Sequence, residues 1–150
     1  MVTASEQLDK RFIELRAISQ GARPPRGWIR AIRESLGMTT AQMASRLGVQ
    51  QPRVIELEKG EVSGNITVQS LERAASALGC RFVYALVPIK PLTQTLEDRA
   101  LRVADQKIAS VEQTMRLEDQ RVDDQEGRKK MIQRLVAELL HRPARLWDEK

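Results

Sequence analysis

The sequence predicts a mainly α-helical protein with one short strand and a long C-terminal helical extension. Three observations predict this fold class. Hydrophobic residues make up 41% of the 150 residues but aromatic residues only 3%, which favours aliphatic helix packing over a large sheet. Apolar residues recur every three or four positions, as on one face of a helix. A single run, residues 80–88, is rich in β-branched and aromatic residues and stops at Pro88, which indicates a strand.

Composition excludes several classes of function. The sequence holds no apolar run of 18 residues and no apolar leader segment, so we expect a cytoplasmic protein that neither spans a membrane nor is exported. Cys80 and His141 are the only cysteine and histidine, too few soft ligands for zinc. No glycine-rich phosphate loop or catalytic grouping accompanies them. We therefore expect no enzyme activity, metal or cofactor, and a buried Cys80 is simpler than a reactive thiol.

Positive charge gathers in the first 90 residues. They contain 13 Lys and Arg against 8 Asp and Glu, whereas residues 91–150 contain 12 of each. The whole net charge of +5 therefore belongs to the first part. This asymmetry is expected if the first part meets nucleic-acid phosphates and the second does not.

Residues 1–25 predict an amphipathic helix followed by a basic arm. Four apolar residues recur at helical spacing: Leu8, Phe12, Leu15 and Ile18. The helix should end near Gly21, and Pro24 and Pro25 should start the next one. Two interpretations stay open. The helix docks on the protein with a solvated charged face, or its Lys and Arg residues grip backbone phosphate.

Two short helical patterns meet at Gly48. Apolar residues at helical spacing lie on both sides of it: Met43, Ala44, Leu47, Val54 and Leu57. Each pattern is too short to be stable alone, and a glycine can take the positive φ that ends one helix and turns the chain into the next. The arrangement predicts a helix-turn-helix. A preceding helix supports it, with an expected buried face of Trp28, Ile29, Ile32 and Leu36.

The second helix of the motif carries side chains suited to base recognition. Pro52 is tolerated only near a first turn, so the helix should begin at about Gln50. Glutamine can bond adenine and arginine can bond guanine in the major groove. We therefore predict base contacts by Gln50, Gln51 and Arg53. Glu56 can accept a hydrogen bond from cytosine or pair with Arg53.

The motif resembles the Cro/cI-type, XRE-like helix-turn-helix family from about residue 28 to 78. The resemblance is carried by Leu36-Gly37-Met38, by Thr40 and Ala44, and by Glu58-Lys59-Gly60. It implies a five-helix domain, here residues 26–90, that binds double-stranded DNA. It also implies a structural ion pair between Arg33 and Glu58. Thr40, and Asn65 in the turn after the second helix, complete the predicted DNA contacts.

The end of this domain raises the question of a dimer. Thr67 predicts the N-cap of a helix that ends at Gly79. The predicted strand 80–88 has no partner strand elsewhere in the sequence. Pairing with a second copy would make a two-fold homodimer that reads two half-sites. Packing on the N-terminal segment, or continuation of a helix, is the alternative.

Residues 91–150 predict a helical extension for dimer or partner contact. Apolar residues at 96, 100, 104, 108, 111, 115 and 122 form a narrow stripe, typical of a long, mostly solvated helix. A break is expected between 113 and 130. A denser amphipathic pattern from Met131 to Leu140 follows. Its apolar face must dock on the long helix, on a second subunit or on another protein.

The whole chain resembles the family named mobile mystery protein A. The order RPPRGWIRAIRESLGM, the motif, LERAASALGCRFVYALVP and a charged helical tail carries the resemblance. The family occurs on bacterial mobile elements beside a Fic-domain protein. It implies a cytoplasmic, nucleoid-associated, antitoxin-like autoregulator with a Fic partner, although Thr114–Asp119 departs from the Fic-inhibition motif at its last position. The alternative is a protein-interaction module that acts through the tail, with the helix-turn-helix as scaffold.

Overall fold

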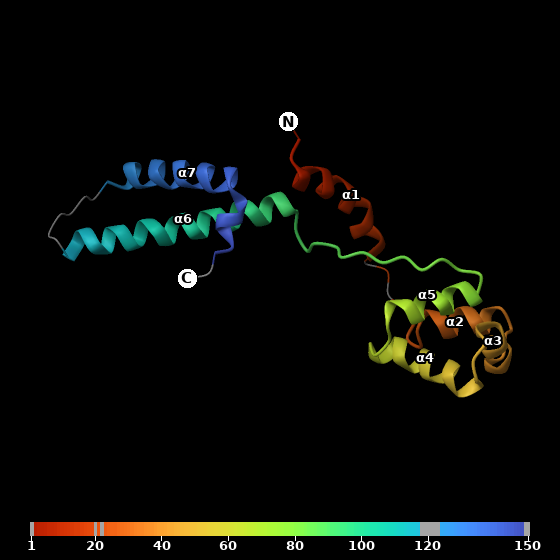
Figure 1. The fold of residues 1–150 in the computed structure, drawn as a ribbon. Coiled ribbons are helices and arrows are strands. Elements are labelled where there is room, and N and C mark those ends of the chain that lie inside the picture. The colour runs from red at the N-terminus through yellow and green to blue at the C-terminus, as the bar shows by residue number, and fades with distance from the viewer. Residues whose placement is uncertain (1, 20, 22, 118–123, 149–150) are drawn as a thin grey trace. The chain divides into compact units, whose positions relative to one another are not determined.

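The computed structural model describes residues 2–19, 21, 23–117 and 124–148. Within these ranges the chain forms seven α-helices, α1 to α7, one short 3-10 helix, η1, and no strand (Figure 1). The helices fall into two compact units. We call Arg16–Leu86 the motif unit, and Met1–Leu15 with Val87–Lys150 the helical unit. The chain therefore begins in the helical unit, passes through the motif unit and returns.

Four helices build the motif unit: α2 Trp28–Ser35, α3 Thr40–Leu47, α4 Gln51–Ser63 and α5 Val68–Ala77. Their ends follow local signals. Thr39 and Gln42 form a capping box at the start of α3, in which each side chain accepts a hydrogen bond from the backbone N–H of the other residue. Gly48 ends α3 with φ of 69°, which turns the chain into α4. Thr67 caps α5.

A small aliphatic core holds these helices together. Its buried members are Ile29, Met43, Ala44, Val54, Ala74 and Leu78. Met43 of α3 and Val54 of α4 are fully buried, so the two motif helices are fixed against each other. Trp28 and Leu36, predicted to be buried, are 54% and 58% exposed. The reason is that α2 has only about two turns, with Ile29 and Arg33 facing inward.

The predicted five-helix count and the predicted strand are both wrong for the described residues. Only α2 to α5 lie wholly within the motif unit. Residues 80–88 run without a strand assignment, and the backbone of residues 81–87 has no hydrogen-bond partner in the described chain. A strand needs a neighbouring strand to pair with, and the described residues supply none. Cys80, expected to be buried, is exposed.

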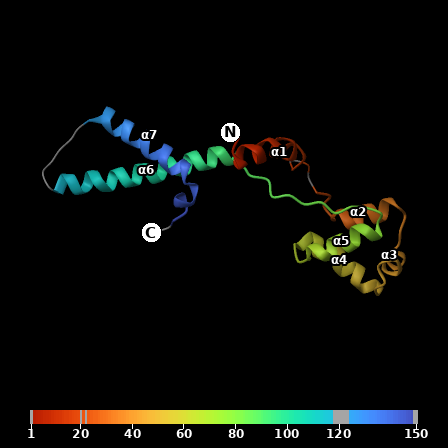
Figure 2. The ribbon, with the colours of Figure 1, turned by 45° about the horizontal axis from the view of Figure 1, so that its top comes forward.

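In the helical unit, α6 Leu92–Leu117 and α7 Gln125–His141 form a hairpin that η1 Pro143–Leu146 closes (Figures 1 and 2). The buried seam consists of Ala100, Ala104, Leu139 and Leu146. The helix that carries the dense apolar pattern, α7, therefore packs on the long helix α6 of its own chain. Val122 and the end of Thr114–Asp119 lie outside the described residues.

Polar contacts reinforce this hairpin. Arg128 pairs with Glu112 at 2.9 Å and with Asp105 at 2.8 Å. Both carboxylates raise the pKa of the Arg128 guanidinium, chiefly through the charge of Glu112. Arg99 Nε donates to the Leu146 carbonyl at 2.8 Å. No helix in the described part of the chain combines the length and apolar character needed to cross a bilayer.

The first helix, α1 Ala4–Ser19, contributes its residues up to Leu15 to the helical unit, where one of its carboxylates contacts α6. Asp9 accepts hydrogen bonds from Leu92 N at 2.7 Å and from Thr93 N at 3.0 Å. It thus caps the start of α6, as a local Ser or Asp does in other helices. No residue of α1 is buried, so the predicted apolar stripe remains at least partly exposed.

Candidate nucleic-acid interface

The predicted base-contacting residues gather at the start of α4. Gln50 is the N-cap, Gln51 is the first helical residue, and Pro52 occupies the first turn. The inward face of α4 carries Val54, Leu57, Glu58, Gly60 and Glu61. Gln50, Gln51, Arg53 and Glu56 are all exposed. The helix therefore presents amide, guanidinium and carboxylate groups together on its outer side.

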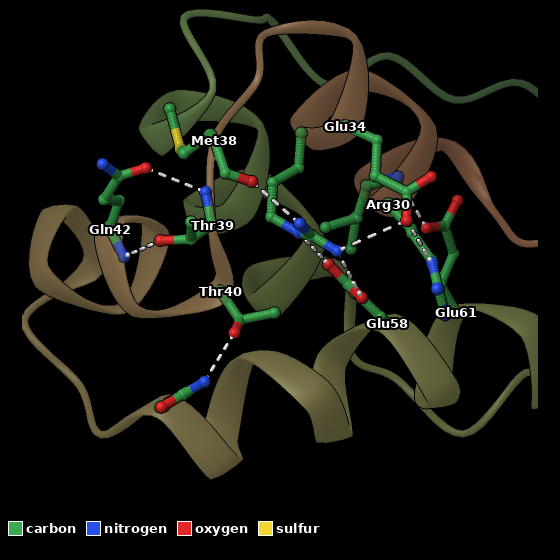
Figure 3. A network of polar contacts seen from close by, with 11 residues as sticks. Arg30, Glu34, Met38, Thr39, Thr40, Gln42, Glu58 and Glu61 are labelled. Atoms are coloured by element: carbon green, nitrogen blue, oxygen red, sulfur yellow. Dashed lines mark hydrogen bonds and ion pairs between the residues drawn. The ribbon is translucent and has the colours of Figure 1, made fainter.

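Gln51 is oriented by the preceding helix. Its Nε2 donates to Thr40 Oγ1 at 2.7 Å, and Thr40 is the first residue of α3, directed toward the start of α4 (Figure 3). An amide has two N–H donors and a carbonyl acceptor. One bond to Thr40 therefore leaves an N–H and Oε1 free, which is the pair that adenine requires.

Arg53 is held by its own helix. Its Nη1 lies 3.0 Å from Glu56 Oε2, and the two side chains are 52% and 65% exposed. Of the two interpretations of Glu56, the structure shows the pair with Arg53. An exposed pair of this kind contributes little to stability. Arg53 can therefore exchange Glu56 for a guanine at small cost.

A buried ion pair fixes α4 beneath this surface. Arg33 donates from Nε to Glu58 Oε1 at 2.5 Å and from Nη2 to Oε2 at 3.3 Å, and both residues are only 7% exposed. Arg33 Nη1 also donates to the Met38 carbonyl at 2.8 Å, so Met38 and Glu58 meet one guanidinium (Figure 3). The hydrogen bond that Arg33 donates to Glu58 raises the pKa of the Arg33 guanidinium despite its burial. The implied pair is thus present and joins α2, the turn before α3, and α4.

Asn65 lies beyond the C-terminal end of α4. Gly64, with φ of 81°, ends the helix, and Asn65 follows in an exposed position. It lines a hollow of about 220 Å³ that Arg53, Glu56, Thr67 and Ser70 also line. Asn65 therefore lines one hollow with Arg53 and Glu56, whereas neither Gln50 nor Gln51 lines it.

Sequence reasoning missed Glu61, which holds the start of α2. Its buried carboxylate accepts from Trp28 N at 2.7 Å and from Ile29 N at 2.9 Å. The N-cap residue itself, Gly27, has φ of 85° and no side chain that could accept these hydrogen bonds. Arg23 in turn donates to the Glu61 carbonyl at 2.8 Å. The one available signal was a glycine before a helix where Ser, Thr or Asp is usual.

Gly27→Ala should destabilise the motif unit. A Cβ at Gly27 would lie 2.7 Å from Glu61 Oε2, and φ of 85° is unfavourable for alanine. We expect a loss of roughly 1–3 kcal/mol in the free energy of unfolding, measured in urea. Gly37→Ala is the matched control, because Gly37 has φ of 66° but open space around its Cβ position. Equal losses in the two variants would contradict the role given to Glu61.

Residues 29–84 match a family model described as helix-turn-helix. The match begins at the second residue of α2 and extends past α5 to Tyr84. It covers a little over a third of the chain. Comparison with curated proteins and with solved structures found no match.

Proposed function

Because residues 29–84 form a Cro/cI-type, XRE-like helix-turn-helix domain, we propose that the protein is a sequence-specific DNA-binding transcriptional regulator. One observation carries the proposal. Gln51 and Arg53 are exposed at the start of α4. Gln51 is hydrogen-bonded to Thr40, and Arg53 to Glu56. Such side chains read adenine and guanine edges when a recognition helix enters the major groove.

Selection of binding sites from random-sequence DNA tests this proposal. The intact protein should enrich a recurring half-site, because base contacts by a few side chains favour particular base pairs. DNA recovered without sequence preference would overturn the proposal. If such a protein still bound a protein partner, the interaction-module alternative would be favoured.

The regulator is proposed to act as a homodimer joined through residues 81–87. Val83, Tyr84 and Leu86 are 79%, 76% and 86% exposed, and the backbone of the segment is unpaired in the described chain. The family match extends to residue 84, which supports a place in the domain rather than in a linker. Two antiparallel copies would satisfy each other's backbone groups and cover these side chains. A two-fold dimer suits a pair of half-sites.

Val83→Asp combined with Leu86→Asp should give a monomer. Two carboxylates in each copy would oppose burial of the segment between copies. Sedimentation equilibrium should show a dimer for the wild type and a monomer for the variant. Val111→Asp combined with Leu117→Asp, at exposed apolar positions of α6, is the control and should remain dimeric. A monomeric wild type, or a dimeric Val83/Leu86 variant, would contradict this interface.

For the helical unit we propose a protein partner. Four apolar side chains on α6 and α7 are at least half exposed: Leu101, Val111, Leu117 and Met131. Exposed apolar side chains of this kind mark interaction surfaces when they are contiguous. The whole-chain resemblance implies a Fic-domain protein as this partner and an antitoxin-like role. Truncation after Pro91 should then abolish co-purification with that protein and leave DNA binding to the motif unit.

A further inference from the structure

A groove runs between α2 and α4, on the side of α4 opposite the hollow beside Asn65. Its volume is about 320 Å³. The residues that matter here are Arg26, Arg30, Ile55, Glu58, Lys59 and Val62. Ile55 and Val62 are 40% and 43% exposed. None of the predicted base contacts lines this groove.

The groove is electropositive. Arg26, Arg30 and Lys59 line it, and its one carboxylate, Glu58, is already bound by Arg33. Neither the Arg26 nor the Lys59 side chain makes a hydrogen bond or ion pair with a described residue. The cationic groups of Arg26 and Lys59 are therefore available to bind an anionic ligand.

The positive charge around the groove lowers the pKa of the neighbouring Glu34 carboxylate. The hydrogen bond from Arg30, 2.8 Å long, lowers the pKa of Glu34, and the charges of Arg26 and Arg33 lower it further. Glu34 thus stays ionised and holds Arg30 in place. Arg26, Arg30 and Arg33 all act on the single carboxylate of Glu34. Positive charge therefore exceeds negative charge on this side of the motif unit.

The position of the groove relates it to the base-reading end of α4. Lys59 lies two turns after Gln51, a rise of roughly 12 Å along the helix. A helix whose first turn enters a major groove about 12 Å wide brings its later turns up to the sugar–phosphate backbone. Lys59 and Arg26 should then face phosphates that flank the bases read by Gln51.

We infer that this groove binds the DNA backbone: Arg26 and Lys59 contact phosphates, and Ile55 and Val62 lie against the sugars between them. The inference rests on the proposed function and deepens it, because the groove supplies affinity while Gln51 and Arg53 supply selectivity. Charge complementarity favours a polyanion here. Continuity with the exposed side of α4 favours duplex DNA over an acidic protein segment.

The test uses the full-length protein with Arg26→Gln and Lys59→Gln together. The probe is a fluorescein-labelled duplex of mixed sequence, and its dissociation constant is measured between about 50 and 200 mM KCl. Each lost phosphate contact lowers the slope of log K against log salt by about 0.9, so the slope should fall by about 2. The variant should then lose about tenfold less affinity than the wild type over this salt range. Its preference among sequences should not change.

Two matched variants separate the groove from general charge effects. Lys107→Gln with Arg116→Gln removes the same charge from exposed positions of α6 and should keep the wild-type slope. Arg26→Lys with Lys59→Arg keeps the charge and should also keep the slope. The groove proposal would be overturned if the groove variant kept the wild-type salt slope, or if the slope of the α6 variant fell equally. The regulator proposal would still hold in either case if the protein kept its wild-type preference among sequences. A wild type that binds no duplex would overturn both.

Discussion

Arg33→Ala should lower the free energy of unfolding of the motif unit by about 3–5 kcal/mol. The substitution leaves the Glu58 carboxylate, only 7% exposed, without its cation. It also removes the donor to the Met38 carbonyl. Small domains are stable by roughly 5–15 kcal/mol, so this loss is a large share of the total. Urea unfolding followed by far-ultraviolet circular dichroism measures it.

Two further variants show whether the buried charge is the cause. Arg33→Met with Glu58→Leu removes both charges and should recover most of the lost stability, because an apolar pair of similar volume often replaces a buried ion pair without loss. Arg30→Ala breaks a pair whose side chains are 35% and 47% exposed and should cost less than about 1 kcal/mol. An Arg33→Ala protein as stable as the Arg30→Ala protein would contradict this account.

Gln51→Ala combined with Arg53→Ala should abolish discrimination at the bases these residues read. Each good bidentate contact contributes about 1–3 kcal/mol of discrimination, or roughly a factor of 5 to 150. Both side chains are exposed on α4, so stability should change little. Competition between the selected site and single-base variants of it measures the loss.

The control for this variant is Gln69→Ala with Arg73→Ala. These residues have the same types, are exposed, and lie on α5 instead of α4. The control removes the same charge and should keep the wild-type preference among bases. If both double variants lost preference equally, the assignment of base reading to α4 would be wrong.

The helix-turn-helix could be predicted because its signals are local. Thr39 caps α3, Gly48 ends it, and Pro52 marks the first turn of α4, and each signal acts within a few residues. The Arg33–Glu58 pair, 25 residues apart, came from the family resemblance, since no local rule connects these positions.

The remaining features depend on contacts that no local pattern contains. Glu61 caps α2 from 32 residues away, and Asp9 caps α6 from 83 residues away. A carboxylate in such a role looks like any other surface acid in the sequence. Residues 80–88 have the composition of a strand but no ladder partner in the described chain. Trp28 has the spacing of a core residue, yet it stands at the start of a short helix and is exposed.

Base reading by the outer side of α4 can be observed in the amide resonances of the intact protein. Backbone and side-chain amide resonances are followed during titration with the selected duplex. We expect the largest shifts at Gln51 and Arg53 and at Thr40, the neighbour that orients Gln51. Shifts confined to residues 92–146, with none from 50 to 56, would contradict it.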